Sequence, residues 1–107
     1  MFKFAAVCAL VVVQTTLAQA AQPPKFDVKA TCRQAQPLMG DQTDQGIYQS
    51  CVNEENGARS QLRSSWSTYK ASTRKSCVDE AQIGGAPSYV DLLTCLQLYQ
   101  DATTLPQ

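Results

Sequence analysis

The sequence contains no histidine, and its charges cancel, with nine Lys and Arg residues against nine Asp and Glu residues. The missing imidazole excludes the Ser-His and Cys-His nucleophiles of many hydrolases. It also removes the commonest metal ligand. The even charge balance predicts no basic patch for nucleic acid or anionic lipid. These absences argue against the common enzyme classes and against a nucleic-acid-binding protein.

Several catalytic and metal-binding motifs are also missing. The sequence has no C-x-x-C pair and no glycine-rich phosphate loop. The pattern S-x-x-K occurs at Ser67 and Ser72, but the S-D-N and K-T-G companions found in penicillin-recognising enzymes are absent. Neighbouring acids such as Glu54 and Glu55 project in different directions from a helix and cannot flank one bond. We therefore expect no catalytic residues, no metal site and no cofactor.

No apolar run reaches the roughly 20 residues needed to span a bilayer as a helix. The longest one, Phe4–Val13, follows Lys3 and precedes Ala18-Gln19-Ala20, which is the pattern of a signal peptide with its cleavage site. We predict a signal peptide over residues 1–20 that takes Cys8 with it. The product would be periplasmic or secreted, with no stable membrane insertion after cleavage.

Four cysteines remain in the mature chain, and an even number in a short exported protein is typical of a disulfide framework. We favour Cys32–Cys51 with Cys77–Cys95. Cys77 and Cys95 lie about equally far from the turn at Gly84-Gly85, so they would face each other in an antiparallel helix pair. The pairing Cys51–Cys77 with Cys32–Cys95 stays open on the sequence alone.

The stretch Pro87–Leu98 is the clearest helix outside the N-terminus. Ser88 and Asp91 resemble a capping box, in which the serine hydroxyl accepts a hydrogen bond from a first-turn amide. Apolar and aromatic residues then recur every three or four positions and form one face: Tyr89, Leu92, Leu93, Leu96 and Tyr99.

Two further helices are predicted, one long and one short. The long helix covers Gln45–Ser65, with Asp44 or Thr43 as its cap, and the short helix runs from Ser72 to about Gln82. A short helical turn after Cys32 would break at Pro37. The predicted fold is all-α: a small disulfide-stapled domain of three main helices (residues 32–105) after the signal peptide and an extended leader (residues 21–31).

One face of the long helix combines core residues with charges: Tyr48, Cys51, Val52, Glu55, Ala58, Arg59, Leu62 and Trp66. Glu55 and Arg59 are four residues apart with the acid first, which favours an ion pair, and the arginine stem would lie over Trp66 or Tyr48. The alternative is a partner surface made of Tyr48, Glu55, Arg59 and Trp66. Gly57 inside this helix suggests a kink or a close neighbour.

Two stretches carry a resemblance: E-x-x-A-R-x-x-L-x-x-x-W over Glu55–Trp66 and S-Y-V-D-L-L-T-C-L over Ser88–Leu96. Together they resemble a family of small exported alphaproteobacterial proteins of unknown function, over about Cys32 to Leu105. The resemblance supports the four-cysteine frame and export. It implies nothing about mechanism.

The leading functional hypothesis is a non-enzymatic exported module that binds an unknown protein or small ligand, or protects the envelope. One alternative is a small periplasmic chaperone, by analogy of size and class alone. Another is an inhibitor that docks through Tyr48, Glu55, Arg59 and Trp66. A thiol-dependent enzyme is the third, and it would need a free, activated cysteine.

Overall fold

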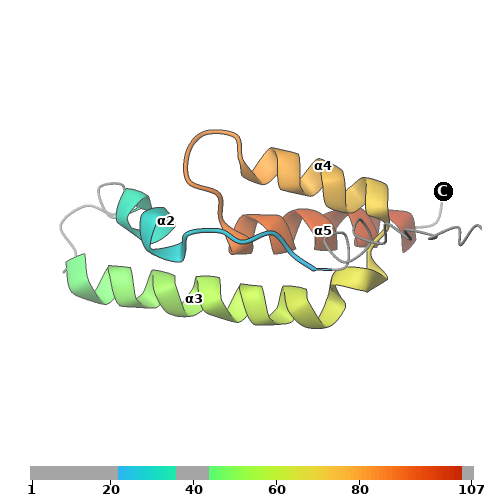
Figure 1. Ribbon diagram of the computed structural model, residues 1–107. Helices are drawn as coiled ribbons and strands as arrows, with labels where there is room; N and C mark the ends of the chain where they lie inside the picture. The colour runs from blue at the N-terminus through green and yellow to red at the C-terminus, as the bar shows by residue number, and fades with distance from the viewer. Residues whose placement is uncertain (1–21, 36–43, 105–107) are drawn as a thin grey trace, which may run out of the picture.

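The computed structural model describes residues 22–35 and 44–104. This part of the chain forms four α-helices and one 3-10 turn and contains no strand, which confirms the predicted all-α class (Figure 1). The elements are α2 (Val28–Ala35), α3 (Asp44–Ser65), η2 (Trp66–Thr68), α4 (Ala71–Ala81) and α5 (Tyr89–Thr104). The signal peptide predicted over residues 1–20, the cap at Thr43 and the break at Pro37 lie outside the described residues.

The long helix α3 packs against both α2 and α5, and α4 packs against the other side of α5 (Figure 1). Their shared core consists of residues on the predicted helices together with Trp66 from η2 and Tyr69 from the connection between η2 and α4: Ala58, Leu62, Trp66, Tyr69, Cys77, Tyr89, Leu92, Leu93 and Leu96. Residues 22–27, here called the strap, precede α2 in an extended conformation. Among the described helices, none is long and apolar enough to cross a membrane.

Both favoured disulfides are present. Cys32–Cys51 joins α2 to α3, and Cys77–Cys95 joins α4 to α5, each with a Cα–Cα separation of 5.6 Å. That separation is in the usual range for a disulfide. The alternative pairing is therefore wrong. Every described helix is held to a neighbour by a covalent bond.

Two predicted boundaries are wrong. The leader was expected to be extended to residue 31, but α2 begins at Val28 because the Asp27 carboxylate accepts a hydrogen bond from the Ala30 amide at 3.1 Å, an N-cap arrangement. Helix α4 begins at Ala71, with Lys70 at the N-cap position and no side-chain capping bond, so Ser72 is not its cap. The other predicted boundaries agree with the structure to within a few residues, except that α5 continues to Thr104.

The N-terminus of α5 is capped as predicted, because the Asp91 amide donates to Ser88 Oγ at 3.2 Å. The predicted apolar face is buried through Leu96. Tyr99, the last member of the predicted face, lies within α5 but is 45% exposed, so the buried part of the face ends at Leu96. Tyr99 lines a space together with Thr68, Thr73 and Leu96.

Gly57 has no close neighbour, contrary to the sequence-based expectation, since a Cβ atom built there meets nothing within 4 Å. We expect Gly57→Ala to raise the free energy of unfolding by about 0.5–1 kcal/mol, because alanine restricts the unfolded chain and favours the helix. Gly85→Ala makes the same substitution at a second glycine and should change stability in the opposite direction. Gly85 has φ +134°, its Cβ would overlap the Gln34 side chain, and the variant should be less stable. Urea unfolding measures both, and a destabilised Gly57→Ala variant would contradict the prediction.

Candidate ligand-binding site

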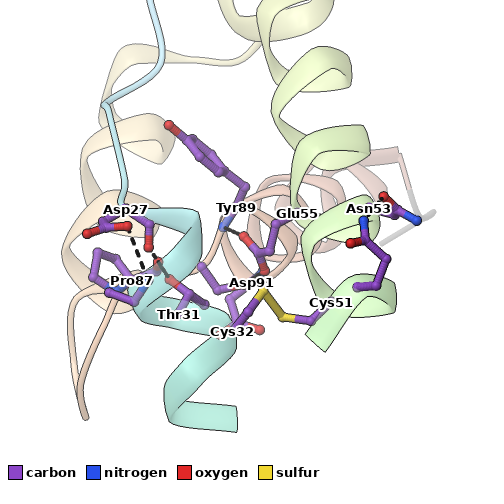
Figure 2. Close-up of a disulfide and its surroundings, with 12 residues drawn as sticks. Asp27, Thr31, Cys32, Cys51, Asn53, Glu55, Pro87, Tyr89 and Asp91 are labelled. Carbon is purple, nitrogen blue, oxygen red and sulfur yellow. Dashed lines mark hydrogen bonds between the residues drawn. A yellow bond between two sulfur atoms is a disulfide. The ribbon is translucent and has the colours of Figure 1, made fainter. Parts of the chain in front are cut away.

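A buried carboxylate fixes the start of α5 against α3. Glu55 is 4% exposed, and its two oxygens accept hydrogen bonds from Ser88 Oγ at 2.5 Å and from the Tyr89 amide at 2.6 Å (Figure 2). The first amides of a helix have no partner within the helix, and its N-terminus carries a partial positive charge. Glu55 supplies both the acceptor and the opposite charge, and it thereby sets the position of Tyr89.

Tyr89 in turn holds the strap. This side chain is 1% exposed, its hydroxyl accepts a hydrogen bond from the Phe26 amide at 2.8 Å, and it donates one to the Pro24 carbonyl at 3.0 Å. Its ring lies 4.8 Å from the Phe26 ring, centroid to centroid. Two hydrogen bonds and a ring contact therefore order an extended segment that lies 63 to 65 residues away in the sequence.

Arg59 lies over the Tyr89 ring, with its guanidinium carbon 5.9 Å from the ring centroid. The predicted ion pair with Glu55 is wrong: neither side chain forms an ion pair with any residue that the structure describes. The Glu55 oxygens are instead engaged by Ser88 and Tyr89. The arginine that stacks on Trp66 is Arg74, at 5.6 Å.

The proposed partner surface of Tyr48, Glu55, Arg59 and Trp66 does not exist as a surface. Glu55 and Trp66 are buried, and Tyr48 and Arg59 are half-buried. Part of this helical face is therefore core, and a protein partner cannot contact these four residues together.

Strap residues 22–25, Arg59, Arg63 and Tyr89 line a half-open space of about 460 Å³, here called the cationic hollow. Three of these residues carry positive charge (Lys25, Arg59 and Arg63), and no Asp or Glu lies among them. None of the three forms an ion pair within residues 22–35 and 44–104. The fold thus brings three positive charges together, although the sequence as a whole contains equal numbers of positive and negative residues.

One feature of the sequence could have indicated this gathering. No acid occurs between Asn56 and Val78, a stretch that contains Arg59 and Arg63 one helical turn apart. Like charges at this spacing repel each other by a few tenths of a kcal/mol. The contribution of Lys25 could not have been found, because the position of the strap depends on contacts with Tyr89, more than 60 residues away in the sequence.

The residues that line the hollow supply cationic hydrogen-bond donors and apolar side chains, and no Ser, Thr, Cys, Asp or Glu lies among them. Cationic donors of this kind suit an anionic group.

Comparison of the chain with protein-family models, with curated proteins and with solved structures found no match. The resemblance to small exported proteins therefore stays a prediction.

Proposed function

We propose that the protein is a non-enzymatic ligand-binding module of the periplasm or the extracellular space, and that the cationic hollow holds its ligand. The observation that carries this proposal is the way the hollow is built. Two segments far apart in the sequence are fixed around it by Tyr89, so its walls are in place before a ligand arrives. Pre-formed concave sites of about 300–1,000 Å³ are typical of small-molecule binding.

Two disulfides support the proposed location, because such bonds form and persist mainly in oxidising compartments. The signal-peptide pattern at the N-terminus supports the same location. The proposal that the protein is not an enzyme is supported by the missing histidine and by the lack of a Ser, Thr, Cys, Asp or Glu among the residues that line the hollow.

The proposal is tested by screening small molecules, charged and neutral, for compounds that raise the melting temperature of the oxidised protein. A ligand present at 100 times its Kd adds about 2.7 kcal/mol to the free energy of unfolding. Hydrogen exchange then locates the site, and we expect slower exchange of the Phe26 amide when the ligand is bound. A screen in which no compound shifts the melting temperature would contradict the proposal, as would a ligand that protects another part of the molecule.

The Tyr89→Phe variant tests how the Tyr89 hydroxyl holds the strap while the ring stays in the core. The variant loses the two hydrogen bonds to Pro24 and Phe26 but keeps the ring, so we expect a loss of about 1–2 kcal/mol in the free energy of unfolding. Exchange of the Phe26 amide should become faster and ligand affinity should fall. Tyr99→Phe is the control, because Tyr99 is half-exposed and is not among the residues that line the hollow. Equal behaviour of the two variants would show that Tyr89 does not order the hollow.

A further inference from the structure

We propose that the ligand of the cationic hollow carries a phosphate monoester group, which Lys25, Arg59 and Arg63 bind together. This inference rests on the proposed function and specifies its ligand class. The three side chains come from the strap and from two successive turns of α3.

The charge balance of the hollow favours this group over a single carboxylate. Three positive charges line the space without an acid among them. One carboxylate would leave two of these charges uncompensated. A phosphate monoester carries a charge of about −1.5 to −2 and presents three acceptor oxygens. It therefore compensates more of the positive charge than one carboxylate does, leaving about one charge over, and it offers one acceptor oxygen to each of the three cationic side chains.

The type of side chain points to the same chemistry. A guanidinium group presents a planar fork of donors that matches the oxygens of phosphate, and it stays charged at any physiological pH. Arg59 and Arg63 are four residues apart on α3 and thus project from the same side of the helix. An anion between them would relieve their mutual repulsion.

Arg63 alone has a simpler explanation, because it lies in the last turn of α3, where a cation interacts favourably with the helix dipole. That explanation does not cover Arg59, which lies in the middle of the helix. It does not cover Lys25 either, which lies on a different segment. The convergence of all three on one hollow is what indicates a ligand.

The size of the hollow indicates that the phosphate group belongs to a larger molecule. A volume of about 460 Å³ exceeds what a bare phosphate fills, and Pro23, Pro24 and Tyr89 offer apolar walls for an organic remainder. Sugar or glycerol phosphates and the headgroup of phosphatidic acid share this chemistry. The experiment below distinguishes the free compound from the lipid.

The test is calorimetric titration of the oxidised protein with glycerol 3-phosphate, with citrate as a carboxylate probe and with vesicles of phosphatidylcholine with or without phosphatidic acid. We expect binding of glycerol 3-phosphate, or of the phosphatidic acid vesicles if the source is a lipid. In either case, Arg63→Gln should weaken it about tenfold, the effect of losing one charge-assisted contact. Arg63→Lys should restore part of the affinity because it keeps the charge. Lys70→Gln is the control, since it makes the same charge change at an exposed side chain outside the hollow.

Several results would overturn the inference. Equal weakening in Arg63→Gln and Lys70→Gln would mean diffuse electrostatic attraction. Tighter binding of citrate than of either phosphate probe would assign the hollow to carboxylates. If neutral compounds bind in the screen and phosphates do not, the phosphate inference fails while the proposed function stands. If nothing binds, both fail.

Discussion

Glu55→Ala should lower the free energy of unfolding by about 3 kcal/mol, because the substitution leaves the Ser88 hydroxyl and the Tyr89 amide without their acceptor. Hydrogen bonds to a charged, buried group are among the strongest in a folded protein. For a domain of this size, we expect a fall in melting temperature of roughly 15 °C. Calorimetry or circular dichroism measures it directly.

Glu54→Ala is the matched control, because the neighbouring carboxylate is exposed and its removal should change stability by less than about 0.5 kcal/mol. Glu55→Gln should fall between the two, since it keeps one acceptor oxygen and loses the charge that favours the N-terminus of α5. An unchanged melting temperature for Glu55→Ala would mean that this carboxylate does not fasten α3 to α5.

Removal of the Cys32–Cys51 disulfide should weaken ligand binding at the cationic hollow by about tenfold or more, whereas removal of Cys77–Cys95 should not. The two bonds close loops of nearly equal length, with sequence separations of 19 and 18 residues. In the chain-entropy model each contributes about 3 kcal/mol. Their effects on stability should therefore be similar, and their effects on the site should differ.

The difference follows from what each bond holds. Cys32 anchors α2, and the strap leads directly into α2, so its loss frees one wall of the hollow. Cys77 and Cys95 join α4 to α5, and neither helix contributes a cation to the hollow. We expect Cys32→Ser with Cys51→Ser to speed Phe26 amide exchange and to weaken ligand binding by about tenfold or more. Cys77→Ser with Cys95→Ser should preserve both properties under conditions where it is still helical. Equal losses in both double variants would show that the strap is not held by the first disulfide.

The helical frame and the disulfide pairing were predictable because they depend on local pattern. Apolar spacing identified α3 and α5, and the equal distance of Cys77 and Cys95 from one turn identified their pairing. The N-cap of α2 by Asp27 is also a local signal, and it was missed because Pro23-Pro24 suggested an extended leader.

The candidate site as a whole was not predictable, because the contacts that assemble it join residues that are distant in the sequence. The hydrogen-bond partners of the Glu55 carboxylate lie more than 30 residues further along the chain. The partners of the Tyr89 hydroxyl lie more than 60 residues before it. Helical spacing suggested that Glu55 would meet Arg59 within the same helix. The amide at the start of α5 competes better for the carboxylate, and Arg59 is left to face the Tyr89 ring and the hollow.

The most direct test of the ligand site is an amide NMR titration of the oxidised protein with glycerol 3-phosphate, or with short-chain phosphatidic acid if only the vesicles bind. The site described above predicts saturable shifts confined to strap residues 22–26, to the Arg59–Arg63 turn of α3 and to Tyr89. Shifts that instead follow the other surface cations, such as Lys29 and Lys75, or an unchanged spectrum at saturating concentration, would contradict it.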